Sequence, residues 1–269
     1  AEVYIKRIIR HKYVLKSYRQ INDPDKQAFK MAPLPPAPIH KCMASSSILA
    51  DIIIEKFFYH MPFHRVIQKY RELGVNISSS TMGDWHAAVC EKLKLLYDRL
   101  KVDVFNSDYI QVDESTLPVI DNEKHRAVKG YMWVVRNANT GEVIFHYDLG
   151  SRSTETALKL LKDYNGAIQT DGYQAYERFE GMKGKKMLGC WAHARRKFFD
   201  ALTENKQLAT EGIDFIAKLY HIEDQTKDLT YEQRAERRQK EAYPVIRDFE
   251  VWLQDTSCKV LKSGRMYKA

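Results

Sequence analysis

The chain has 269 residues, of which 44% are hydrophobic and 29% are charged, and its formal net charge is +8 with a sequence pI of about 9.1. It has no run of about 18 apolar residues and no signal-peptide pattern, so it is predicted to be an intracellular globular protein with one large or two smaller domains. The four cysteines are scattered without a Cys-x-x-Cys pair, which argues against a disulfide framework and a four-cysteine zinc site. The positive charge favours encounter with a polyanion such as nucleic acid.

The first part of the chain predicts little regular structure. Residues 1–20 alternate imperfectly between apolar and basic side chains, which indicates one or two strands. Residues 31–38 read M-A-P-L-P-P-A-P, and prolines at this density favour an extended connector, so we expect a domain boundary there. His40 and Cys42, on either side of Lys41, are too few ligands for a zinc site.

Residues 45–104 predict a helical domain of three helices. Serines at positions 45–47 and 78–80 are suitable N-caps for the first and third helices, and Gly74 is a suitable stop for the second. Helix, turn, serine cap and helix are compatible with a DNA-reading helix-turn-helix, although plain helical packing produces the same pattern more often. The third helix is expected to bury Trp85, Ala88, Val89, Leu93, Leu96 and Leu100.

From residue 107 the hydrophobic period changes to two. Strands are predicted at residues 109–119, 130–137 and 142–148, with a hairpin between the last two. A helix capped by Ser153 follows, then strands at 167–171 and 185–190, and a helix that begins near Trp191. A right-handed crossover would return the fourth strand parallel to the first. This order is that of a ribonuclease-H-like domain, so the predicted fold class is α/β (α+β) with a mixed sheet and helices.

Two of these strands share one pattern, Y-I-Q-V-D-E-S at residues 109–115 and A-I-Q-T-D-G-Y at residues 167–173. Because side chains alternate along a strand, Asp113 and Asp171 lie on the face opposite the core residues. On neighbouring strands they would form a carboxylate pair suited to a hard divalent cation. Glu114 is expected to point to the other face, so it is not a predicted ligand.

Basic side chains cluster on the helix that begins near Trp191. His193, Arg196 and Lys197 share one face with Asp200, next to the expected acidic site, and are predicted to contact DNA phosphates. The alternative is a solvated basic face with a surface histidine.

Other candidates for DNA contact have weaker support. Arg152 and Lys129 are looser candidates for phosphate contacts. Tyr173 and Tyr176 could stack on DNA bases, although half-buried packing is the more common role of such rings.

Beyond Asp200 the sequence predicts helices. Residues 204–258 form a helical insertion, in which Pro244 should kink or break a long charged helix, and residues 259–269 show no strong pattern. Glu223 could be proposed as a third carboxylate, but a solvated helix residue is the more common reading.

Several motifs, taken together and in order, resemble the transposases of the insertion-sequence-66 family, which belong to the DDE class. They are P-F-H-R-V, G-V-N-I-S-S-S-T-M-G-D-W, Y-I-Q-V-D-E-S, G-Y-M-W-V-V, I-Q-T-D-G-Y-Q-A-Y and G-C-W-A-H-A-R-R-K-F-F-D. The resemblance runs from about residue 3 to the end of the chain. Several ordered motifs are far more specific than any single one.

The resemblance implies metal-dependent DNA cleavage and strand transfer at the ends of a mobile element, with Asp113 and Asp171 as the first two acidic ligands of a two-ion Mg²⁺ or Mn²⁺ site. The family's third acid is a glutamate in an N-N-x-x-E-R type motif, which does not occur here, so it is expected beyond Ala269. Residues 1–20 resemble a cysteine-free remnant of the family's upstream zinc module. The chain is therefore expected to be a fragment that is inactive alone.

The partners and location that the resemblance implies are DNA, a homo-oligomer assembled on that DNA, no membrane, and the bacterial cytoplasm with association to the nucleoid. The expected segments are an upstream remnant and linker at 1–44, a helical domain at 45–104, a catalytic core at 105–203, a helical insertion at 204–258 and a truncated tail at 259–269.

Two other functions stay open at this point. One is a DNA-binding or assembly module without chemistry of its own, which the missing third acid supports. The other is a ribonuclease-H-like nuclease with a cellular role, against which the helical insertion and the extent of the resemblance count.

Overall fold

Two units, Ala1–Asp98 and Arg99–Ala269, make up the chain. The computed structural model describes residues 3–14, 16, 29–40 and 42–269. The strand prediction at residues 1, 2, 15 and 17–20, and Lys41 of the rejected zinc motif, lie outside these residues. No helix in the described part of the chain has the length and apolar character of a membrane span.

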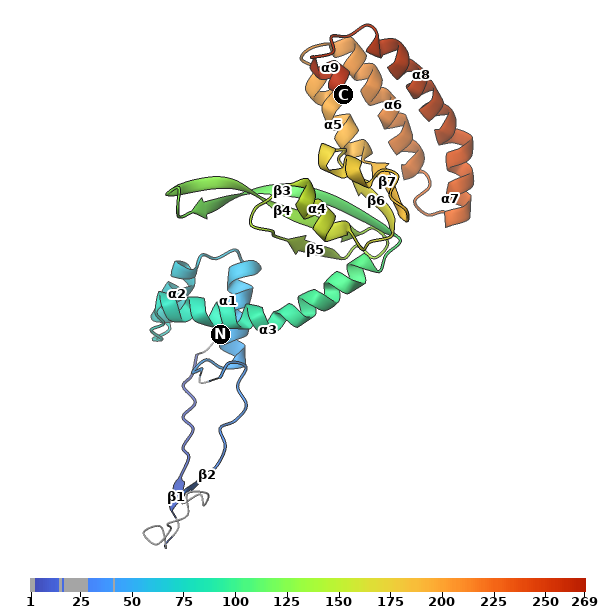
Figure 1. Cartoon of the computed structure of the whole chain (residues 1–269). Coiled ribbons are helices and arrows are strands. Elements are labelled where there is room, and N and C mark those ends of the chain that lie inside the picture. The colour runs from blue at the N-terminus through green and yellow to red at the C-terminus, as the bar shows by residue number, and fades with distance from the viewer. Residues whose placement is uncertain (1–2, 15, 17–28, 41) are drawn as a thin grey trace. The chain divides into compact units, whose positions relative to one another are not determined.

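The first unit holds a small two-stranded sheet and a helical part (Figure 1). Strands β1 (Lys12–Val14) and β2 (Phe29–Met31) pair antiparallel. Helices α1 (Ser46–Phe57) and α2 (Phe63–Glu72) follow, and α3 (Ser79–Phe105) begins in this unit. The predicted caps are present: the Ser45 side chain accepts from the Ile48 amide, and Gly74 has a φ of 82°.

Tyr70 joins α2 to α1 in the core of this unit. It is 2% exposed, and its hydroxyl donates to the Asp51 carboxylate at 2.6 Å. Replacing Tyr70 by phenylalanine should lower the free energy of unfolding by about 1 kcal/mol, because Asp51 is partly exposed and water can replace part of the lost hydrogen bond. Urea denaturation measures the difference, with Tyr59→Phe, whose side chain is 60% exposed, as the control. Equal losses in the two variants would contradict this role of Tyr70.

The second half of α3 corrects one prediction. Leu93 and Leu96 were expected to be buried, but they are 42% and 67% exposed. Helices α1 and α2 have 12 and 10 residues, whereas α3 has 27, so they are about 18 and 15 Å long against about 40 Å. They can therefore cover only part of α3 within this unit, and its pattern of leucines extends beyond them.

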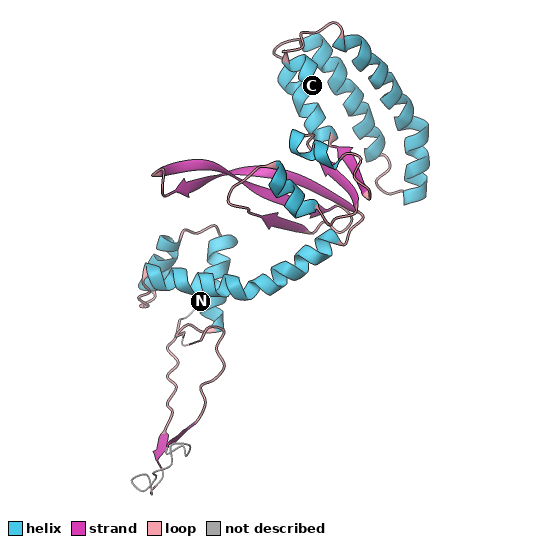
Figure 2. Ribbon diagram, in the orientation of Figure 1, coloured by secondary structure: helices cyan, strands magenta, loops and turns pink. Residues whose placement is uncertain are grey.

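The second unit contains a mixed sheet, drawn in magenta in Figure 2. Its five strands have the order β5-β4-β3-β6-β7. The strands are β3 (Tyr109–Asp121), β4 (Arg126–Asn137), β5 (Val143–His146), β6 (Gly166–Thr170) and β7 (Lys185–Gly189). Strands β3, β4 and β5 pair antiparallel, and β6 pairs parallel to both β3 and β7. This topology confirms the predicted fold class, a ribonuclease-H-like mixed sheet with helices.

Strands β3 and β4 are longer than predicted and run together into a hairpin between Asp121 and Arg126. Pro118 lies inside β3, opposite Lys129. Strand β6 pairs with β3 only at Tyr109–Gln111, so β3 has one neighbour at Pro118, and a proline is tolerated on such an edge.

Helices occupy the rest of the unit (Figure 1). Helix α4 (Thr154–Leu161), capped by Ser153, packs against the 3₁₀ helix η2 (Gln174–Phe179). After β7 come α5 (Trp191–Ala201), α6 (Lys206–Asp224), α7 (Tyr231–Arg237), a π-helical turn η3 (Arg238–Ala242), α8 (Tyr243–Ser257) and α9 (Arg265–Lys268). Pro244 therefore interrupts the long helix through a π turn, and the helix then continues. The sequence pattern of residues 259–269 did not predict α9.

The helical core of this unit is built on Phe198 of α5, Ile216 of α6 and Phe249 of α8, all buried. Gly212 of α6 permits this packing, because a Cβ atom there would lie 2.6 Å from the Phe198 ring. One face of α5 is thus packed against α6 and α8, and its other side chains remain available to the sheet.

Candidate active site

Asp113 lies on β3, and Asp171 directly follows the end of the adjacent parallel strand β6. Gln111 and Gln169 are register partners, and the Gln111 side-chain amide Nε2 donates to Gln169 Oε1 at 2.6 Å. The aspartates two residues further along each segment therefore lie side by side. Strand β6 ends at Thr170, and Asp171 accepts a hydrogen bond from the Tyr173 amide at 2.9 Å. Parallel pairing of β3 with β6 therefore creates the predicted carboxylate pair.

Glu114 joins this pair, which the sequence analysis did not expect. One carboxylate oxygen from each of Asp113, Glu114 and Asp171 lies within 4.8 Å of the others, the one such acidic group among the described residues. The predicted face was right, since the Glu114 side chain is fully buried whereas that of Asp113 is 55% exposed. Glu114 nevertheless lies near the aspartates, because its long side chain extends to the end of the shorter β6, next to Asp171.

Glu114 is held in place by Tyr176 and Arg152. The Tyr176 hydroxyl donates to Glu114 Oε1 at 2.6 Å, and Arg152 Nη2 lies 3.4 Å from Glu114 Oε2. Burial raises the pKa of Glu114 above its ordinary value, against the opposing effects of the Tyr176 hydrogen bond and the Arg152 charge. The position of Glu114 thus depends on two side chains outside β3, one on η2 and one in the loop before α4.

Arg152 supplies the positive charge nearest to these acids. Its Nη2 also lies 3.7 Å from Asp171 Oδ2, and its guanidinium stacks over the Tyr173 ring at 3.8 Å from the centroid. Its Nε is buried and has no hydrogen-bond partner. The structure therefore brings this predicted phosphate ligand to the acidic group, where it balances two carboxylates.

His193 is the residue of α5 that reaches the site. Its Nε2 lies 3.9 Å from Asp113 Oδ2, and its Nδ1 is buried without a hydrogen-bond partner. Arg196 and Lys197, on the same predicted basic face, are exposed. Helix α5 thus places one side chain at Asp113 and presents further positive charge to solvent.

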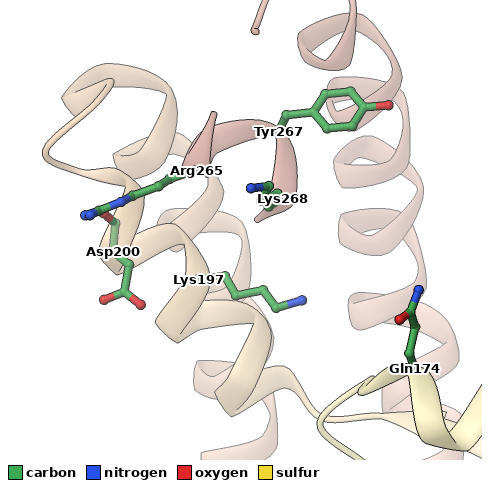
Figure 3. A pocket seen from close by; sticks show the side chains of 6 residues that line it. All are labelled: Gln174, Lys197, Asp200, Arg265, Tyr267 and Lys268. Carbon is green, nitrogen blue, oxygen red and sulfur yellow. The ribbon is translucent and has the colours of Figure 1, made fainter. Parts of the chain in front are cut away.

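Lys197 lines a basic cavity of about 910 Å³ at the other end of α5 (Figure 3). Three cations and one acid reach this cavity from α5 and α9, and Gln174 reaches it from η2. Its lining residues are Gln174, Lys197, Asp200, Arg265, Tyr267 and Lys268. This excess of positive charge suits a phosphate group.

Three other candidates have different surroundings. Lys129 is opposite Pro118, five residues along β4 from the partner of Asp113, and its ammonium lies 5.4 Å from the Tyr131 ring centroid. Tyr176 is 2% exposed, so it packs in the core rather than presenting its ring. Glu223 is bound by Arg238 through two hydrogen bonds of 2.6 Å and is absent from the acidic group.

Comparison with known proteins identifies the family of the chain that carries this site. The sequence model described as "Transposase IS66 family" matches residues 41–269, most of the chain. The chain belongs to the IS66 transposase family. The family assignment confirms the resemblance drawn from the ordered motifs and supports a transposase-type function.

Curated relatives of this transposase-family chain come from Sinorhizobium fredii (strain NBRC 101917 / NGR234). Uncharacterized protein y4jD is 29% identical over 279 residues, which cover 98% of this chain and 53% of the relative. Uncharacterized protein y4qI is 27% identical over 230 residues, which cover 80% of this chain and 42% of the relative. The chain thus spans about half the length of the curated relatives it matches.

Proposed function

We propose that the chain carries most of the catalytic core of a DNA transposase, with Asp113 and Asp171 as metal ligands for phosphodiester cleavage and strand transfer at mobile-element ends. The observation that carries this proposal is that Asp113 on β3 meets Asp171 at the end of the adjacent parallel strand β6, in a member of a transposase family. The third acid of the active protein would come from sequence beyond Ala269.

The acidic group suits a hard divalent cation such as Mg²⁺ or Mn²⁺. Its donors are all carboxylate oxygens, which these ions prefer, and they lie within 4.8 Å of one another. Asp113 and Asp171 would hold the metal, and Glu114 is close enough to contribute. When bound, two such ions would activate the attacking hydroxyl and stabilise the leaving oxygen.

The chain's own residues would bind and orient the DNA strand. Arg196 and Lys197, which are exposed on α5, would contact DNA phosphates, Lys197 from the basic cavity at the far end of the helix, and the partly exposed Arg152 guanidinium would contact a phosphate near Asp171. His193 would orient the Asp113 carboxylate or contact the adjacent phosphate. Lys129, which is remote from the acids, would contact DNA only along the β3–β4 hairpin.

The remaining parts of the proposal concern partners and domains. DNA is the partner that the family implies, and the net charge of +8 favours it. We propose a homo-oligomer assembled on DNA at the bacterial nucleoid. We also propose that the helical segment 45–104 acts as a DNA-contacting domain beside a core at 105–203 and an insertion at 204–258.

Isothermal titration with Mn²⁺ tests the metal site. The chain should bind Mn²⁺, and Asp171→Asn should weaken that binding at least about tenfold, because the variant removes one charged oxygen ligand from the group. Asp163→Asn is the matched control, since the Asp163 side chain is 89% exposed and lies outside the acidic group. Binding that is absent, or equal in the two variants, would instead support a DNA-binding module without chemistry of its own.

A further inference from the structure

A second cavity lies among the helices of the C-terminal unit, and none of its lining residues belongs to the acidic group. Its volume is about 530 Å³, within the range of pockets that bury small organic ligands. Three aromatic side chains line it: Trp191 of α5, Tyr220 of α6 and Tyr243 of α8. Their exposed fractions are 39%, 42% and 50%, so a large part of each ring is open to contact.

The polar lining of this aromatic cavity favours a neutral group over a phosphate. Both oxygens of Glu223 accept from Arg238, at 2.6 Å from Nε and 2.6 Å from Nη2, and Gln239 lies beside them. Glu223 already balances the guanidinium, so the aromatic cavity offers donors and acceptors without net positive charge. A planar polar ring with donors and acceptors on its edge, such as a nucleobase, matches this lining.

The backbone at the aromatic cavity is itself irregular. Arg238–Ala242 form a π-helical turn just before Pro244, which has no amide hydrogen to donate to the preceding turn. The turn contributes Arg238, Gln239 and Ala242 to the lining. Single π turns inside α-helices occur frequently at functional sites.

Helix α5 and strand β3 connect the aromatic cavity to the acidic group. Trp191 and His193 are two residues apart on α5, a rise of about 3 Å, with their side chains on opposite sides of the helix, and His193 Nε2 lies 3.9 Å from Asp113 Oδ2. The hydrogen bond to Glu223 is the main cause of the raised pKa of Arg238, and Tyr109, on the same face of β3 as Asp113, adds a smaller contribution. Asp113 lies four residues further along β3 than Tyr109, a distance of about 13 Å, or about four base steps of DNA.

We propose that the aromatic cavity receives one unstacked nucleobase of a DNA strand whose scissile phosphate lies at Asp113. This inference rests on the proposed transposase function, since it takes the acidic group to be the place where DNA is cut. Stacking on Trp191 and a tyrosine would hold the base, while the Glu223–Arg238 pair and Gln239 would contact its edge. The basic cavity at Lys197 would contact the backbone of the same strand.

Fluorescence anisotropy with two labelled single strands tests this inference. One is a short oligothymidylate, and the other is an abasic strand of the same length and the same number of phosphates, both measured in EDTA so that metal binding plays no part. The unaltered chain should bind the oligothymidylate at least about tenfold more tightly than the abasic strand. Trp191→Ala and Tyr243→Ala should each reduce that preference and leave abasic binding unchanged, whereas Tyr231→Ala, 83% exposed and outside the aromatic cavity, should keep it.

The outcomes separate this inference from the proposed function. A preference that is absent in the unaltered chain, retained in both cavity variants, or lost together with abasic binding would overturn the nucleobase site. Asp113→Asn should keep the preference, because it changes only the acidic group. A normal preference with no Mn²⁺ binding would therefore sink the metal site alone, and normal Mn²⁺ binding with no preference would sink the nucleobase site alone.

Discussion

Asp113→Ala in the full-length protein is expected to abolish strand transfer while DNA binding persists. Asp113 is the most exposed member of the acidic group, with 55% of its side chain open to solvent, and it lies beside both Asp171 and His193. The substitution would remove one of the carboxylates proposed to hold the metal. Losing a ligand of a catalytic metal can lower the reaction rate by several powers of ten. DNA binding should persist because the basic residues of α5 are unchanged. Product formation on element-end DNA and an electrophoretic mobility shift on the same DNA measure the two properties.

Asp121→Asn provides the control for this experiment. Asp121 ends the same strand, and its Oδ1 accepts from the amides of Glu123 and Lys124, a role that the asparagine oxygen can retain. The control should transfer strands at the normal rate. If Asp113→Ala kept its activity, or lost DNA binding to the same extent, the metal-site assignment would be wrong.

Strand alternation predicted the sheet and the carboxylate pair because both depend on local pattern and on topology. The repeated Gln-x-Asp sequence placed Asp113 and Asp171 on one face, and the crossover rule made their strands parallel neighbours. The register of Gln111 with Gln169 then brings the aspartates together without further adjustment. The sheet and the carboxylate pair could be predicted from the hydrophobic period, the order of the strands and the handedness of the crossover alone.

Glu114 shows what such a pattern leaves out. Alternation assigns a side chain to a face of the sheet, but it does not give the reach of a glutamate past the end of a shorter neighbouring strand. The location of Glu114 depends on Tyr176 and Arg152, which are 62 and 38 residues away in sequence. Long-range partners of this kind have no period in the sequence, and the pairing of Arg152 with the acids was missed for the same reason.

The leucines of α3 show the converse case. Helical period predicted an inward apolar stripe on α3, but its members are at most partly buried, and Leu93 and Leu96 are exposed because the helices that could cover them within their unit are shorter than α3. Pro244 likewise predicted an interruption, while its local form, a π turn that lines the aromatic cavity, depends on how α8 packs against α6. Period thus predicts which side of an element is apolar, and tertiary packing decides what contacts it.

Trp133 packs against the residues that hold Glu114 of the acidic group in place. It is fully buried on β4, opposite Glu114 on β3. Its indole N–H donates to the Ser151 carbonyl at 3.0 Å, next to Arg152, and its ring meets Tyr176 edge-on at 6.2 Å. The two side chains that fix Glu114 therefore both depend on packing around this one ring.

Trp133→Ala is expected to lower the free energy of unfolding of the C-terminal unit by about 3 to 5 kcal/mol, because it leaves a cavity the size of an indole ring and an unpaired carbonyl. Trp133→Phe keeps most of the ring and should cost about 1 to 3 kcal/mol, chiefly through the lost hydrogen bond. Trp191→Ala, at 39% exposure, should cost less than either. Guanidinium unfolding followed by circular dichroism measures all three. If the alanine variants at 133 and 191 were equally stable, Trp133 would not be the support of the sheet that its burial and its hydrogen bond indicate.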